Sequence, residues 1–186
     1  MKRLQYNSPV ILSFFFLSLL ALLLGHMTGG WTTAGLFSVY LSSLADPLTY
    51  IRFLGHVLGH ADLSHFLGNM LLLLVVGPPL EEKYGSRTLL IGMVLTALVS
   101  GVLQFICFPN SALLGASGIV FMLIMLASLA GMKDGRIPLT LILAAVLYLG
   151  QEVYAMVALR DNVANFMHLV GGVTGTVFGV VLAKRR

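Results

Sequence analysis

The sequence predicts an all-α, polytopic membrane protein, and three observations support this fold class. Hydrophobic residues make up 58% of the 186 residues and the mean hydropathy is +0.96. Only 10% of the residues are charged, whereas a soluble domain carries about a quarter, so lipid must surround most of this surface. The apolar residues also fall into runs close to the ~20 residues that an α-helix needs to cross a hydrocarbon core.

Six apolar runs predict six membrane-spanning helices in a single domain that covers residues 1–186. The runs are 9–27, 65–80, 88–108, 114–132, 137–157 and 164–183. The second run is short and begins with polar residues, which a bilayer tolerates only where those side chains face protein or water. The first run follows two basic residues and could also be a cleaved signal peptide, but it is long for one and no Ala-x-Ala pattern follows it.

The basic residues collect at one set of span ends and so predict the orientation. Nine of the eleven Lys and Arg residues lie there, namely Lys2, Arg3, Lys83, Arg87, Lys133, Arg136, Lys184, Arg185 and Arg186. The opposite ends hold only Arg52 and Arg160. By the positive-inside rule both termini are cytoplasmic, and the segments 28–64, 109–113 and 158–163 face outward. The net charge of +4 therefore reflects topology and not nucleic-acid binding.

The first outward segment, residues 28–64, is long and mixes polar with apolar residues. We expect it to be partly embedded at the membrane interface, with Trp31 in the aromatic belt. The one cysteine, Cys107, excludes an intramolecular disulfide and a cysteine-rich metal site. We expect Cys107 to be a small apolar filler near the outer end of the third span.

Polar residues at membrane depth are informative because each must be paired or functional. His65 and Asn69 are four residues apart and share one face of the second span. Ser117 lies a few residues into the fourth span, among small residues that leave its backbone open to close approach. His168 lies a few residues into the sixth span. That span also carries glycines at every fourth position, which let another helix pack closely: Gly171, Gly175 and Gly179.

Each of these features alone fits a structural role. His65 and Asn69 could bond to a neighbouring helix, Ser117 could stand at a helix contact, and His168 could be a hydrogen-bonded core residue. The histidines at 56, 60 and 65 could suggest a metal cluster, but the chain has no HExxH motif and no acidic residue at ligand spacing.

The topology nevertheless brings these residues of three spans into one outer layer of the membrane. A serine nucleophile needs a base for its proton, and His168 can serve. The oxyanion that develops needs fixed donors, which the Asn69 amide, a His65 N–H and the Ser117 backbone N–H could supply. No acidic residue is placed to orient His168, so the arrangement predicts a dyad and not a triad.

Three segments in this order resemble the motifs of the rhomboid intramembrane serine proteases. HFLGN (65–69), GASG (115–118) and HLVGGVTG (168–175) match H-x-x-x-N, G-x-S-G and H-x-x-G-x-x-x-G, and GPPLEEKYGS (77–86) resembles a glutamate-containing cytoplasmic turn of the family. The resemblance covers about residues 52–183. It implies a six-helix rhomboid bundle in a bacterial cytoplasmic membrane. It also implies an endopeptidase without a cofactor that cuts single-pass membrane proteins near the outer face, after a small residue.

The resemblance assigns a role to each matching residue. Ser117 is the nucleophile and His168 the base, with His65, Asn69 and the Ser117 N–H around the oxyanion. Four further residues form or support the pocket: Gly115, Gly118, Phe121 and His60.

Two departures from the family pattern stand out. Phe121 occupies a position where many bacterial relatives have tyrosine, so its ring can pack against His168 but offers no hydroxyl. Trp31 is followed by Thr32, so the Trp-Arg pair common in the first loop of the family is missing, and this means of anchoring the loop is not expected.

Two alternatives remain open. A catalytically silent relative could bind membrane proteins without cutting them, although such relatives typically lose the serine or the histidine and this chain keeps both. A small channel or transporter fits less well, because the polar residues stop in the outer part of the spans.

Overall fold

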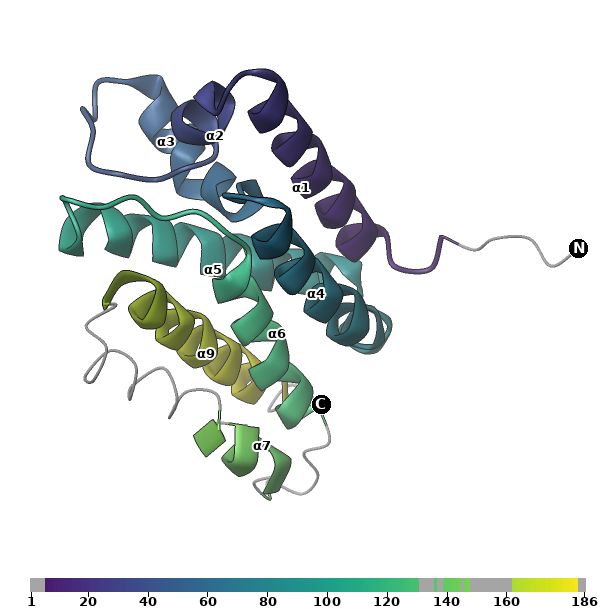
Figure 1. The fold of residues 1–186 in the computed structure, drawn as a ribbon. Helices are drawn as coiled ribbons and strands as arrows, with labels where there is room; N and C mark the ends of the chain where they lie inside the picture. Colours follow the sequence, from purple (N-terminus) through teal and green to yellow (C-terminus); the bar gives the residue numbers. More distant parts are fainter. Residues whose placement is uncertain (1–5, 131–135, 137–138, 145, 148–161, 184–186) are drawn as a thin grey trace, which may run out of the picture.

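The computed structural model describes residues 6–130, 136, 139–144, 146–147 and 162–183, and this part of the chain is mainly helical (Figure 1). Its elements are α1 (Pro9–Met27), α2 (Trp31–Leu36), α3 (Pro47–Gly55), the 3-10 helix η1 (His56–Leu58), α4 (Leu63–Tyr84), α5 (Ser86–Cys107), α6 (Ser117–Leu129), α7 (Leu139–Ala144) and α9 (Asn162–Ala183). An isolated antiparallel bridge joins Val39 to Leu113.

Several predicted spans coincide with observed helices. Three of them, α1, α4 and α5, are long and apolar enough to cross a membrane, and α1 has the predicted bounds. The helix α6 and the apolar part of α9 (Phe166–Leu182) are shorter. The fifth predicted span, 137–157, contains α7, but most of it lies outside the described residues, as does most of the segment 158–163. The count of six spans stays a prediction.

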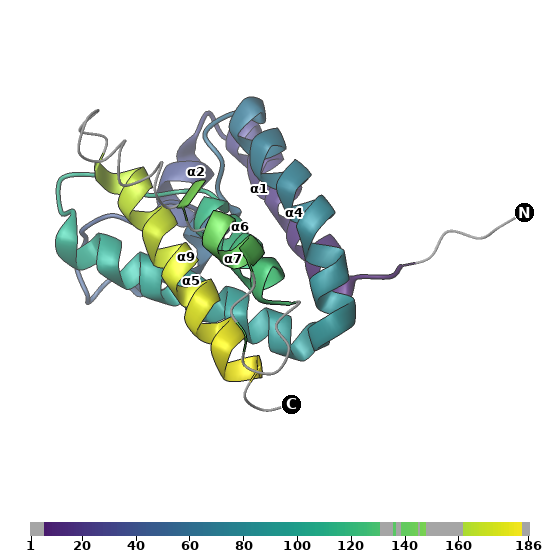
Figure 2. The ribbon, with the colours of Figure 1, turned by 90° about the horizontal axis from the view of Figure 1, so that it is seen from below.

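The helix α6 lies at the centre of the described helices, with α4, α5, α7 and α9 around it (Figure 2). Apolar residues occur all around this helix, a pattern that requires burial on every side. Its fully buried side chains are Ile119, Met122, Leu123, Met125 and Leu126. The N-terminal end of α6, where Ser117 lies, is therefore held by the core of the protein.

The glycine repeat of the sixth predicted span packs against α6, as expected. A Cβ atom on Gly171 would collide with the carbonyl oxygen of Gly118, and one on Gly175 would collide with the backbone of Met122. Lack of side chains at these positions lets the two backbones touch. The predicted role of the repeat as a helix-packing strip is confirmed.

The second predicted span is longer than expected at both ends. The Asp62 side chain caps α4 by accepting a hydrogen bond from the His65 N–H at 2.8 Å, so the helix begins at Leu63. It continues through Pro78 and Pro79 and ends at Tyr84, before Gly85. The prolines remove two backbone donors, but the helix does not stop there, and the residues just after them are buried.

Glu81, one of those buried residues, joins α4 to the start of α1. Its two carboxylate oxygens accept hydrogen bonds from the backbone N–H groups of Val10 and Ile11, at 2.9 and 3.0 Å. These donors belong to the first turn of α1, where no intrahelical acceptor exists. The segment expected to be a glutamate-containing turn is therefore mostly the last part of α4, and its Glu81 fixes the first span on the second.

The segment 28–64 folds into three short helices around the buried side chain of Arg52. The guanidinium donates to the Gly35 carbonyl at 2.7 Å, pairs with Asp46 at 3.3 Å and lies over the Tyr40 ring at 4.7 Å. Asp46 also caps α3 through the Leu48 N–H. An arginine thus anchors this loop even though no Trp-Arg pair precedes it at Trp31. Embedding of the loop in the membrane interface stays a prediction.

The expectation for Cys107 is wrong. Cys107 is the last residue of α5 and is exposed, because the chain leaves the helix at Phe108. The thiol therefore fills no gap in the core.

The contact between α6 and α9 generates a matched pair of substitutions. We expect Gly175→Ala to destabilise the protein by about 1–3 kcal/mol, because the new methyl group collides with the Met122 backbone. Gly68→Ala on α4 is the control, since no atom lies within 4 Å of its added Cβ, and alanine favours a helix by up to about 1 kcal/mol. Unfolding of both variants in detergent micelles measures the difference. Equal stabilities of the Gly175→Ala and Gly68→Ala variants would contradict the close contact between Gly175 and the Met122 backbone.

Candidate active site

Ser117 is the first residue of α6, which corrects the prediction that it lies a few residues inside the span. The first helical hydrogen bond runs from the Val120 N–H to the Ala116 carbonyl at 2.9 Å. Gly115 has φ +124°, a left-handed conformation that no helix contains, so α6 cannot begin earlier. The N–H groups at the start of a helix have no intrahelical acceptor and carry partial positive charge.

The chain just before Ser117 is tied to the first loop. The Gly115 N–H donates to the His56 carbonyl at 2.9 Å, and Leu113 and Val39 exchange two backbone hydrogen bonds of 2.9 Å each. Residues far apart in the sequence therefore fix the approach to α6.

His56 is a structural part of this site. The sequence indicated for it only membership of a possible histidine metal cluster, for which no acidic ligand is suitably spaced. Burial lowers the pKa of His56 to about 4, so the ring is neutral at pH 7. Its Nδ1 lies 3.1 Å from the Arg52 carbonyl, which can only accept, so Nδ1 donates. Its Nε2 lies 3.3 Å from the Ser100 hydroxyl and is left as the acceptor. A signal existed in the sequence, because buried polar residues recur every fourth position of α5, at Thr96, Ser100 and Gln104.

His65 and Asn69 both face Gly115. The Ala61 N–H donates to Nδ1 of His65 at 3.4 Å, which puts the proton of the neutral ring on Nε2. A Cβ atom on Gly115 would lie 2.7 Å from that Nε2 and 4.0 Å from the amide nitrogen of Asn69. The same amide donates to the His65 carbonyl at 3.1 Å, leaving its second N–H. The structure thus brings two side-chain donors to the backbone just before Ser117.

His168 stacks on Phe121, which confirms the expected ring contact. The two ring centroids are 4.5 Å apart and the planes differ by 6°. Phe121 follows Ser117 by one turn on the same face of α6. Close contact between the backbones at Gly118 and Gly171 holds α9 against this first turn. His168 is therefore placed beside the face of α6 that begins with Ser117.

His60 packs behind the donors. Its ring meets those of His65 and Phe66 edge to face, with centroids 5.0 and 5.4 Å apart, and its Nδ1 bonds to the Leu58 carbonyl at 3.1 Å. Burial, and then the neighbouring His65, lower the pKa of His60 to about 4. Within the part of the chain that the structure describes, no group of three or more His, Cys, Asp or Glu residues could hold a metal ion.

Comparison with known proteins places the chain in a family. A family model described as Rhomboid domain matches residues 47–185. Rhomboid-related protein 1 of Caenorhabditis elegans is 36% identical over 143 residues, which are 70% of this chain and 39% of that protein. Rhomboid protease GlpG of Pectobacterium atrosepticum is 28% identical over 180 residues, 92% of this chain and 62% of that protein. The chain thus spans about two fifths to three fifths of the length of these curated relatives.

The two buried histidines predict how stability depends on pH. The unfolded chain takes up protons near pH 6.5 and the folded chain only near pH 4. The free energy of unfolding should therefore be highest above pH 7 and fall as the pH decreases from about 6.5 to 4, on the order of 3 kcal/mol for each histidine.

Thermal denaturation in detergent micelles between pH 4 and 7.5 measures this dependence. His56→Gln should reduce the pH dependence, whereas replacement of the exposed His26 by Gln should leave it unchanged. A wild-type melting temperature that does not fall with pH would show that these rings are not buried in the neutral form.

Proposed function

Because the chain belongs to the rhomboid family, a family of intramembrane proteases, we propose that it is a serine endopeptidase that cleaves transmembrane segments with a Ser117–His168 dyad. The family match and the long apolar helices also make it an integral membrane protein. The observation that carries the proposal is the start of α6. Ser117 opens this helix, two donors face Gly115, and His168 stacks beside the same face.

The proposed reaction follows from these positions. The Ser117 hydroxyl oxygen attacks the scissile carbonyl carbon while His168 takes the hydroxyl proton. The carbonyl oxygen becomes an oxyanion, which accepts hydrogen bonds from His65 Nε2–H, the Asn69 amide and the Ser117 backbone N–H. His168 then gives the proton to the leaving amine, and water releases the second product from Ser117.

In a dyad, the base must be held by something other than the carboxylate that orients it in a triad. Stacking on Phe121 restricts the plane of the His168 imidazole. The backbone contact between α6 and α9 restricts its distance from Ser117. Phe121 cannot donate a hydrogen bond, so its contribution is steric.

We further propose that the substrates are single-pass membrane proteins cut near the outer face of a bacterial cytoplasmic membrane, with both termini of this chain in the cytoplasm. The distribution of basic residues supports the orientation. A helical substrate must unwind before its scissile carbonyl is accessible, and a small residue at the cut would fit beside the crowded Gly115.

Removal of either dyad residue tests the proposal. Ser117→Ala and His168→Ala should each lower cleavage of a model transmembrane substrate by at least ~10⁴-fold in detergent micelles. Ser128→Ala, on the same helix, and His26→Ala are the matched controls and should cleave normally. Cleavage by Ser117→Ala would contradict the assignment. A folded wild-type protein that does not cleave would favour a silent relative that binds membrane proteins.

Loss of one oxyanion donor should be less severe. Asn69→Ala should lower kcat by ~10²–10³-fold, since the other donors remain, with little change in KM because the oxyanion exists only in the transition state. Substrate titration measures both constants, and thermal denaturation checks that the variant folds. A KM effect without a kcat effect would place Asn69 in substrate binding.

A further inference from the structure

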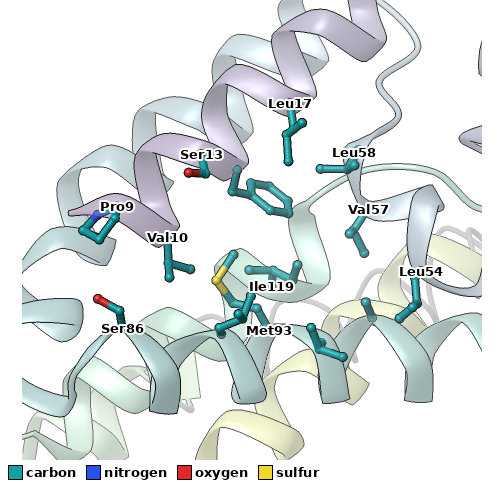
Figure 3. A pocket seen from close by; sticks show the side chains of 14 residues that line it. Pro9, Val10, Ser13, Leu17, Leu54, Val57, Leu58, Ser86, Met93 and Ile119 are labelled. Carbon is teal, nitrogen blue, oxygen red and sulfur yellow. The ribbon is translucent and has the colours of Figure 1, made fainter. Parts of the chain in front are cut away.

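An apolar groove lies between α1 and α5 (Figure 3), and its lining includes none of Gly115, His65 and Asn69. Its volume is about 490 Å³, within the range of sites that hold small organic ligands. Leu54 of α3 and Val57 of η1 close one end, and Ile119 of α6 contributes to the floor.

The groove lies at the surface of α1 and α5, two helices that are long and apolar enough to cross a membrane. Leu17 on α1 is 51% exposed, and Leu90 and Val94 on α5 are 48% and 43% exposed. Apolar cavities do not hold water, and the hydrocarbon layer around these helices consists of acyl chains. An acyl chain is therefore the chemistry that fits the long part of the groove.

The polar atoms of the lining mark one end. Its side chains are apolar except for Ser13 and Ser86, and both hydroxyls lie at the end where α1 and α5 begin. Exposed Arg87 follows at this end of α5. It precedes Leu90 by three residues and Val94 by seven, so it continues the stripe of α5 that lines the groove.

Among the residues that the structure describes, no ion pair joins Arg87 to an acidic side chain. Both oxygens of Glu81 accept hydrogen bonds from α1. Glu82 lines a polar hollow that adjoins this end and shares Ser86 with the groove. The groove thus has an apolar length, two hydroxyls near its mouth and a guanidinium beyond them. This order matches the order of chain, ester and phosphate in a phospholipid.

We propose that this groove binds one acyl chain of an anionic phospholipid, with the phosphate held by Arg87. The lipid belongs to the leaflet in which α1 and α5 begin. Its chain runs along α5 and ends against η1, which carries the His56 carbonyl that binds Gly115. The binding does not depend on proteolysis, so it can be tested separately from the proposed activity.

Native mass spectrometry of the purified chain in detergent micelles tests the binding. The probes are phosphatidylglycerol and phosphatidylcholine with identical acyl chains. Phosphatidylglycerol should bind about fivefold more tightly, the contribution of one basic side chain near a membrane surface. Arg87→Gln should abolish this preference, whereas Arg136→Gln, at an exposed arginine that does not line the groove, should keep it.

A second pair of variants tests the location. Val94→Trp fills the groove and should weaken binding of both lipids, whereas Val99→Trp, at a similarly exposed position of α5 outside the lining, should not. Thermal denaturation confirms that each variant is folded. Equal affinities of the wild-type protein for the two lipids, or equal binding by the two tryptophan variants, would overturn the proposal.

Discussion

The hydrogen bond from the Gly115 N–H to the His56 carbonyl is the interaction on which the candidate site depends. It holds Gly115 at φ +124°, a conformation that a residue with a side chain rarely adopts. The chain can therefore become helical only after this residue, so Ser117 stands at the first position of α6 with its backbone N–H at the helix terminus. The absence of a side chain at Gly115 also leaves room for His65 Nε2. One backbone contact therefore sets the positions of Ser117 and of the donors proposed to act with it.

The partner in this bond is itself fixed by the rest of the protein. His56 is buried between the first loop and α5, and its ring bonds to Arg52 and Ser100. Arg52 in turn orders the loop through Gly35 and Asp46. The loop is thus a structural support of the site, and its folded shape reaches Gly115 through a chain of contacts between buried polar groups. Such groups are costly when unpaired, which favours one arrangement of the loop.

On the other side, α9 is placed by contact between backbones. Glycines at 171 and 175 bring α9 onto Gly118 and Met122 of α6. This contact, with the Phe121 stack, places His168 beside the first turn of α6. The site is therefore built by packing of rigid helices around α6.

Local patterns in the sequence were enough to predict several of the observed helices and to propose the residues of the site. Hydropathy gave the bounds of α1 and nearly those of α9, and the glycine repeat predicted the contact with α6. The motifs placed His65, Asn69, Ser117 and His168 in one layer. The first residue of α6 could not be predicted this way, because it depends on a bond to His56, about sixty residues earlier in the chain. The Arg52 anchor and the Glu81 bonds to α1 were missed for the same reason, since each joins segments distant in sequence.

Covalent labelling with a fluorophosphonate tests most directly the claim that Gly115 sets the position and the donors of Ser117. The phosphonyl oxygen occupies the place of the oxyanion. The rate of labelling therefore reports on the position of Ser117 and on the donors that face the oxyanion. Peptide mapping by mass spectrometry should find the adduct on Ser117 in the wild-type protein. The labelling rate should fall at least ~10²-fold in Gly115→Ala, measured at a temperature where both proteins are folded. An adduct on another serine, or equal rates in the two folded proteins, would contradict the account.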